Sequence, residues 1–238
     1  MNTHIHESVK DEKGFTLVEL AIVMVIIGLL IGGILKGQEM IANAQVSATV
    51  AQAKGIDAAT STFRDMYDAL PGDINNPTIR LPNCAGTCAN AGDGNAQLEN
   101  GPGSNAGENL DFWAHLNAAD LLSGVDNSGA AVWGQGLPSA KAGGGFTVGY
   151  TNNGTLPNNP AGVGRGGHWL TIQGVPSTPG AAALTASEAA RMDRKMDDGS
   201  SSTGSVIASD GGNCEASAGV YNEAADVQDC GLNIRIQG

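Results

Sequence analysis

Residues 13–37 read KGFTLVELAIVMVIIGLLIGGILKG, and this stretch decides how the rest of the chain is organised. Its apolar part, from Phe15 to Leu35, holds 21 residues and a single charged side chain, Glu19. A helix needs about 20 apolar residues to cross the hydrocarbon core of a bilayer. The sequence therefore predicts a transmembrane helix over residues 15–35.

The border of this segment does not follow the pattern of an ordinary secretory signal. No small-residue A-x-A site follows the apolar residues, and the small residue at their border, Gly14, precedes them. The order Gly-Phe-Thr-Leu-Val-Glu resembles the N-terminus of type IV pilins and the related pseudopilins. In that family a prepilin peptidase cuts after the glycine and methylates the new N-terminal phenylalanine. The resemblance implies that residues 1–14 are a leader, removed between Gly14 and Phe15, and that Phe15 is methylated.

The charge of the chain excludes one large class of partners. Its 12 basic and 24 acidic residues give a net charge of −12, without the Lys/Arg clusters that neutralise nucleic-acid phosphates. Neither G-x-S-x-G nor H-E-x-x-H occurs. We therefore expect neither nucleic-acid binding nor an enzyme.

The four cysteines, Cys84, Cys88, Cys214 and Cys230, all follow the predicted long helix. An even number in an exported domain indicates two disulfides, and four cysteines allow three connectivities. Proximity in the sequence favours Cys84–Cys88 and Cys214–Cys230. A zinc site would need C-x2-C-like spacing or nearby histidines, and the cysteine pairs have neither.

A second apolar pattern follows the membrane segment. From Gln38 to Leu70 the chain has no proline, and apolar residues recur in steps of three and four, as in an amphipathic helix. Pro71-Gly72-Asp73 then disfavours further helix. We expect one long helix over residues 15–71, of which 15–35 span the membrane, followed by a globular head over residues 72–238.

The head is expected to be rich in loops, with a few short regular elements. Residues 74–108 are rich in Gly, Asn and Pro and predict irregular structure. Helices are expected at 108–123 and about 187–196, the second with a capping box from Thr185 to Glu188, and strands at 145–150, 168–173, 206–209 and 232–237. Phe112 and Trp113 are assigned to the core rather than to a binding surface. This order predicts an α+β fold.

The same order resembles the pilin plan, in which a long N-terminal helix packs on a small antiparallel sheet. The head motifs also resemble those of a sub-group of bacterial pilin-like proteins. They are YDALPGD at residues 67–73, FW at residues 112–113, and D-x-K-x-D-D-G at residues 193–199.

One acidic cluster, Asp193, Asp197 and Asp198, is a candidate for Ca²⁺. Asp193 and Asp197 are four residues apart and are expected to share a helix face. Carboxylates at a helix C-terminus oppose its dipole, and a bound cation would remove that penalty. Nearby basic residues such as Lys195 offer the same compensation without metal, so both alternatives stay open. No other cofactor is expected.

The resemblance implies a structural subunit of a type IV pilus or of a type II secretion-like filament, as a major pilin, a minor pilin or a pseudopilin. Its partners would be other pilin subunits, the prepilin peptidase and the inner-membrane assembly platform. The head would lie in the periplasm of a bacterium before assembly, and in an extracellular or periplasmic filament afterwards. Glu19 would act in assembly. The alternative is a monomeric, membrane-anchored binding protein or adhesin, for which an acid in the membrane segment has no use.

Overall fold

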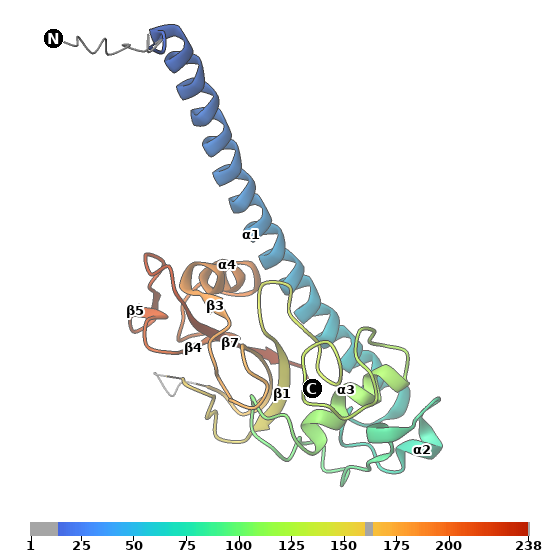
Figure 1. The fold of residues 1–238 in the computed structure, drawn as a ribbon. Coiled ribbons are helices and arrows are strands. Elements are labelled where there is room, and N and C mark those ends of the chain that lie inside the picture. Colours follow the sequence, from blue (N-terminus) through green and yellow to red (C-terminus); the bar gives the residue numbers. More distant parts are fainter. Residues whose placement is uncertain (1–13, 160–163, 238) are drawn as a thin grey trace, which may run out of the picture. The chain divides into compact units, whose positions relative to one another are not determined.

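The computed structural model describes residues 14–159 and 164–237. The chain divides into two compact units, Met1–Ile41 and Ala42–Gly238. Almost all of the expected leader, residues 1–13, lies outside the described residues. The element order is that of an α+β protein, with a long helix first and antiparallel strands later (Figure 1).

Helix α1 runs from Leu17 to Tyr67 and has 51 residues. At 1.5 Å per residue it is about 76 Å long. It ends four residues before Pro71, and thus earlier than the expected boundary, because Asp68 adopts a left-handed backbone with φ of 45°. Proline therefore does not itself stop the helix, although the PGD turn follows at once.

The later part of α1 places a stripe of side chains in the core of the head. The buried apolar residues recur every three or four positions, as Val46, Val50, Ala53, Ile56, Ala59 and Phe63. They join one hydrophobic cluster with Phe112, Trp113 and residues of the sheet. The sequence predicted an apolar stripe in such steps, and Ile56, Ala59 and Phe63 are buried as expected, but Ile41 and Met66, which were expected in the stripe, are exposed. The structure confirms Phe112 and Trp113 as fully buried core residues.

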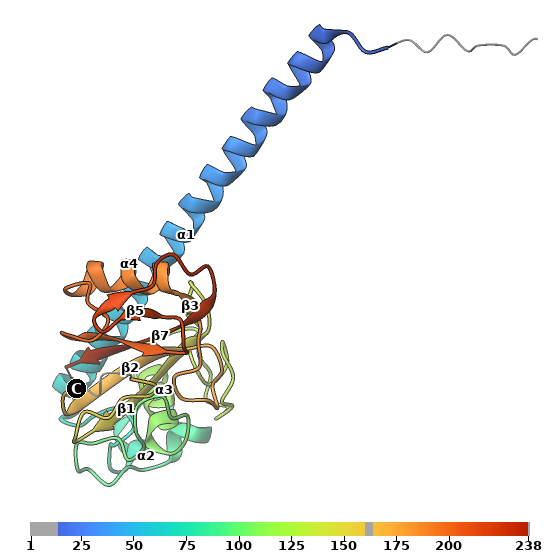
Figure 2. The same cartoon turned by 90° about the vertical axis from the view of Figure 1, so that its left-hand side faces the viewer.

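The head contains one antiparallel sheet of five strands (Figure 2). These strands are β1 (Gly145–Thr151), β2 (Gly167–Gln173), β3 (Leu184–Thr185), β4 (Val206–Asp210) and β7 (Gln228–Ile236). Strand β7 is central, because β2 pairs with its residues 232–236 and β4 with its residues 230–234. These ranges overlap, so β2 and β4 lie on opposite edges of β7.

Both faces of the sheet are covered. Leu170 and Ile172 of β2 belong to the main core, whereas Trp169, which points to the opposite face, packs with Leu156 and Ile207 in a second cluster. Because neither face of these strands is left to solvent, β1 and β2 are buried at almost every position.

Two further helices of the head have 11 residues each. Helix α3 (Glu108–Ala118) is shorter than expected, because Asp120 adopts φ of 57° soon after its end. Helix α4 (Ala186–Met196) begins with the predicted capping box between Thr185 and Glu188.

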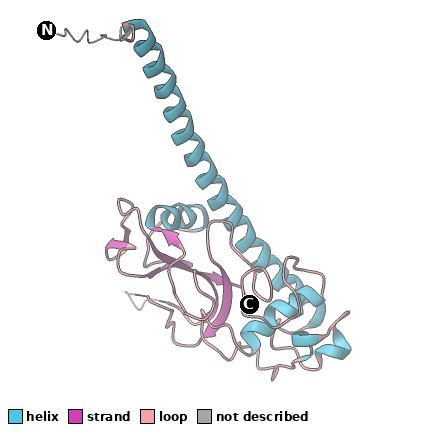
Figure 3. Cartoon of the chain, viewed as in Figure 1, coloured by secondary structure: helices cyan, strands magenta, loops and turns pink. Residues whose placement is uncertain are grey.

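Several short elements escaped the sequence analysis. They are helix α2 (Pro77–Arg80), the 3₁₀ turn η1 (Gly86–Ala89), the hairpin of β5 (Glu215–Ser217) and β6 (Val220–Tyr221), strand β3, and the first residues of β7. Loops connect most of these elements (Figure 3).

Two disulfides fasten these loops, at the pairs that proximity in the sequence favours. Cys84–Cys88 closes the turn at η1, and Cys214–Cys230 joins the β5–β6 hairpin to the central strand β7. Among the described residues there is no free cysteine.

We predict that the second disulfide contributes more to stability than the first. The chain-entropy model gives about 3 kcal/mol for closing a loop with a separation of 16 and about 2 kcal/mol for a separation of 4. Cys214→Ala/Cys230→Ala should therefore lower the free energy of unfolding more than Cys84→Ala/Cys88→Ala. Guanidinium unfolding followed by tryptophan fluorescence measures both. The opposite order, or free thiols at Cys214 and Cys230 in non-reducing peptide mapping, would contradict the prediction.

Candidate functional site

The start of α1 is closed by a capping box that the sequence analysis missed. The backbone N–H and the Oγ1 of Thr16 both donate to the Oε2 of Glu19 at 2.9 Å, and the N–H of Glu19 lies 3.2 Å from the Oγ1 of Thr16. Thr16 is thus the N-cap and Glu19 the third helical residue, the T-x-x-E pattern of a capping box. Glu19 also places its negative charge near the positive end of the helix dipole.

The residues of the expected cleavage site precede this cap. Gly14 and Phe15 lie outside the helix, and Phe15 is 90% exposed. The apolar side chains that follow are exposed as well. Among the described residues, α1 is the one helix long and apolar enough to cross a membrane by length and composition.

The PGD turn after α1 holds the loop that leads to α3. Asp73 is only 2% exposed, and its two carboxylate oxygens accept hydrogen bonds from the N–H groups of Gly94 and Ala96, both at 2.6 Å. Gly72 has φ of 89°, and a Cβ there would lie 2.4 Å from the carbonyl oxygen of Glu108. This turn therefore needs both its glycine and its aspartate.

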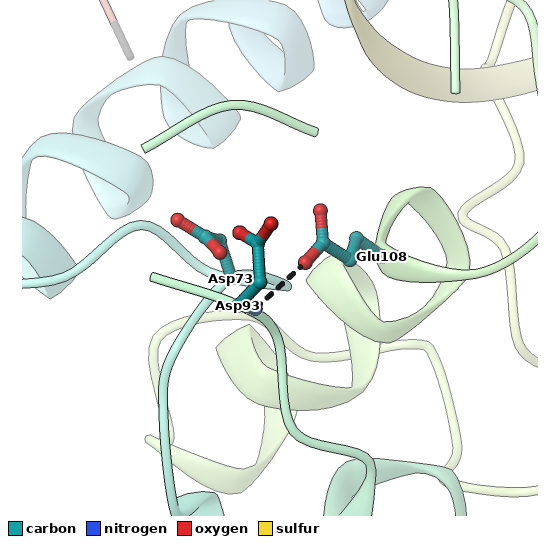
Figure 4. Close-up of side chains that lie close together, drawn as sticks. All are labelled: Asp73, Asp93 and Glu108. Carbon is teal, nitrogen blue, oxygen red and sulfur yellow. Dashed lines mark hydrogen bonds between the residues drawn. The ribbon is translucent and has the colours of Figure 1, made fainter. Parts of the chain in front are cut away.

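Glu108, the first residue of α3, holds the same loop from the other side. Its Oε1 accepts from the N–H of Asp93 at 3.2 Å, and its Oε2 accepts from the N–H of Glu99 at 3.1 Å. The carboxyl groups of Asp73, Asp93 and Glu108 lie close together (Figure 4), with one oxygen of each within 4.8 Å of the others. Burial raises the pKa of Glu108 to about 7, and burial is also the largest cause of the raised pKa of Asp73.

His115 connects this region to the first disulfide. It is fully buried, and its Nδ1 accepts a hydrogen bond from the N–H of Gly72 at 2.8 Å. Its Nε2 lies 3.1 Å from the carbonyl oxygen of Cys88, which requires the proton on Nε2. Burial lowers the pKa of His115 to about 4, so the ring is neutral near pH 7. His115 is therefore a structural residue.

The cluster of Asp193, Asp197 and Asp198 is arranged differently from the expectation. Asp193 and Asp197 do not share a helix face, because α4 ends at Met196 and Asp197 is its C-cap with φ of −147°. Gly199 then turns the chain with φ of 80°, and its N–H donates to the Oδ1 of Asp193 at 3.2 Å.

Protein donors already occupy the three carboxylates of this cluster. Asp193 is fully buried and accepts from the hydroxyl of Tyr221 at 2.9 Å. Asp197 accepts from the N–H of Ser205, and Asp198 accepts from the hydroxyl of Thr203 at 2.6 Å. Burial raises the pKa of Asp193 to about 6, whereas the Thr203 hydroxyl lowers the pKa of Asp198. One oxygen of each carboxylate lies within 4.8 Å of the others, so a cation still has ligands there.

Calcium binding at Asp193, Asp197 and Asp198 stays a prediction. Ca²⁺ would offset the repulsion between these carboxylates, and at ten times the dissociation constant it would raise the melting midpoint by about 3–6 °C. Thermal unfolding of the detergent-solubilised full chain, with Ca²⁺ and then with excess chelator, measures this shift. Asp198→Asn should abolish it, whereas Asp93→Asn, in the other acidic cluster, should not. An unchanged midpoint would leave the protein donors as the only partners.

The comparisons with known proteins concern the N-terminal part of the chain. Residues 9–35 match the family model described as the prokaryotic N-terminal methylation motif. This is the prepilin-type signature, and it supports a type IV pilin-like protein. A search of curated proteins and a search of solved structures found no match to this chain.

Proposed function

We propose that this chain, which carries the prepilin-type signature, is a structural subunit of a type IV pilus or of a type II secretion-like filament. The single observation that carries the proposal is Glu19, an acid inside an otherwise apolar membrane segment. The subunit would be held in the inner membrane by residues 15–35 before assembly, with its head in the periplasm. Its partners would be other pilin subunits, the prepilin peptidase and the assembly platform.

A carboxylate in the membrane segment costs free energy on insertion, and assembly can offset this cost by supplying a cation. Insertion scales give roughly 2.5–3.5 kcal/mol for an aspartate at the helix centre, and the cost is lower near the end where Glu19 lies. In a filament the helix is surrounded by other helices, so the carboxylate can no longer reach the membrane surface and needs a cation. Cleavage after Gly14 would create one, the α-amino group of Phe15. A neighbouring subunit's α-amino group pairing with Glu19 would fix the axial register.

The capping box gives Glu19 a second role that does not require a filament. Its hydrogen bonds with Thr16 satisfy the carboxylate within one chain. A cap of this kind stabilises a helix by about 0.5–2 kcal/mol. A monomeric, membrane-anchored binding protein or adhesin, the second candidate function, would use Glu19 in this way alone. The two functions therefore differ in whether the charge of Glu19 matters or only its hydrogen bonds.

The first prediction of the proposal is cleavage between Gly14 and Phe15 with methylation of Phe15. The apolar helix would remain on the mature protein, because the cleavage site precedes it. Intact-mass analysis of membrane-extracted protein should show the loss of residues 1–14 and the gain of one methyl group. A mature protein that begins at Met1, or after Leu35, would exclude this processing.

The second prediction concerns filament assembly. Glu19→Ala and Glu19→Val should leave membrane insertion and cleavage intact and abolish filaments, since the α-amino group of the next subunit would find no counter-charge. The measurement is the filament yield after shearing, compared with the amount of mature protein in the membrane. The variant must be the only copy of the protein in the cell.

Two matched variants separate charge from capping. Glu19→Gln keeps an oxygen that can accept from Thr16 but removes the charge, because glutamine also serves at this position of a capping box. Thr16→Ala removes the cap and keeps the charge. The filament proposal predicts failed assembly for Glu19→Gln and filaments for Thr16→Ala. Normal filaments from Glu19→Gln would exclude the charge pairing, whereas absence of the unaltered protein from sheared filaments would favour the anchored binding protein.

A further inference from the structure

A hollow of about 370 Å³ lies in the head between a loop and the end of strand β1. Residues of the 95–102 loop form one wall, and residues of the 150–155 segment form the other. Its volume falls within the roughly 300–1,000 Å³ that is usual for small-molecule sites. The hollow therefore has room for a small organic ligand.

The loop wall is held in place by buried polar side chains. Asn109 is fully buried, and its Nδ2 lies 2.9 Å from the carbonyl oxygen of Asn100, 3.2 Å from that of Gly101 and 2.6 Å from that of Val148. The carboxylates of Asp73 and Glu108 hold the preceding residues of the loop.

The loop also lies directly on β1. A Cβ at Gly149 would lie 2.4 Å from the carbonyl oxygen of Gly101, so glycine permits this close approach. The walls are therefore positioned by the fold itself, which lowers the entropic cost of binding a ligand.

The lining is mostly polar, and it also contains one aromatic ring and two apolar residues, Leu98 and Pro102. The side chains that can meet a ligand include the amides of Gln97 and Asn152, the hydroxyl of Thr155, the carboxylate of Glu99 and the partly exposed ring of Tyr150. Of the described residues that line the hollow, none is Lys, Arg or His. Amides and hydroxyls both donate and accept hydrogen bonds, whereas the carboxylate accepts.

This lining disfavours two classes of ligand. An anion would approach Glu99 without a compensating cation, on a chain whose net charge is −12. An apolar ligand would remove water from the amides and the carboxylate without replacing the lost hydrogen bonds. A ligand with many hydroxyl groups avoids both costs, because each hydroxyl donates and accepts, and its C–H faces can pack on the tyrosine ring. We propose that this hollow binds a neutral saccharide.

A larger hollow, of about 660 Å³, gives no comparable indication. It is lined by Arg64 and Arg235 together with Asp57, and an adjoining hollow shares Arg64 with Asp65 and Asp68. The cationic and anionic side chains are therefore mixed, and no ligand charge is favoured. The saccharide proposal does not depend on the filament proposal, because a surface hollow of this kind serves an assembled subunit and an anchored monomer equally.

The test uses the full-length protein in a detergent without a sugar headgroup, on an array of immobilised neutral and sialylated glycans. Neutral glycans should be bound in preference to sialylated ones. Calorimetry with the best neutral glycan then compares variants. Gln97→Ala should weaken binding about two- to tenfold, as expected for one neutral hydrogen bond, and Glu99→Gln should weaken it as well. Tyr150→Phe should retain most of the affinity, because it keeps the ring.

The matched control is Gln135→Ala, another exposed glutamine that does not line the hollow. Tyr150 also contacts His168, with ring centroids 5.0 Å apart, so Tyr150→Ala is interpreted only if its melting midpoint is unchanged. Gln97 and Glu99 are exposed, so their substitution should not disturb the fold. The test therefore does not depend on Tyr150→Ala. The proposal is overturned if no neutral glycan binds, if sialylated glycans bind better, or if Gln135→Ala weakens binding as much as Gln97→Ala.

Discussion

The structure depends on one helix that must suit two different environments along its length. The first part of α1 is apolar on every side, as a helix in lipid or among other helices has to be. The later part buries one stripe in the core of the head, and outside this stripe it carries mostly polar side chains and alanines, with a few exposed apolar residues such as Met66. A single continuous helix thus carries both the apolar N-terminal segment and residues of the core of the head. Because the stripe supplies core residues, the head cannot keep its own core without this helix.

The head compensates for a modest core with buried polar contacts. The chain has 35 glycines and only ten aromatic residues, so much of the head consists of loops with little apolar surface to bury. The loop after α1 is ordered by carboxylates that accept backbone N–H groups, by the neutral ring of His115 and by the Cys84–Cys88 disulfide. Buried polar groups stabilise the fold only when all their hydrogen bonds are made. These contacts therefore define one conformation for the loop, although its composition is typical of irregular segments.

The sequence predicted those features that depend on periodicity and local pattern. The long helix, the buried Phe112 and Trp113, the cap at Thr185 and the pairing of neighbouring cysteines all follow from local rules. The short elements β3, β5 and β6 did not, because two or three residues carry no period and form only when β7 or each other are present. The cluster of Asp73, Asp93 and Glu108 joins residues up to 35 positions apart, so its geometry needs the folded loop.

Two misjudged details were local and could have been recognised. The T-x-x-E pattern at Thr16 could be recognised from the sequence, and the predicted end of α4 at residue 196 already placed Asp197 outside the helix.

The position of β7 in the sheet determines when the head can fold. It is the last described strand along the chain, yet it lies between β2 and β4, which pair with it from opposite edges. Most strand pairs of the sheet must therefore wait until β7, which follows the other described strands in the chain, has been synthesised. Pairings so distant in sequence are slow to form, and the earlier strands meanwhile expose unpaired edges. The head is therefore most vulnerable to proteases and to wrong partners in the interval before β7 joins the sheet.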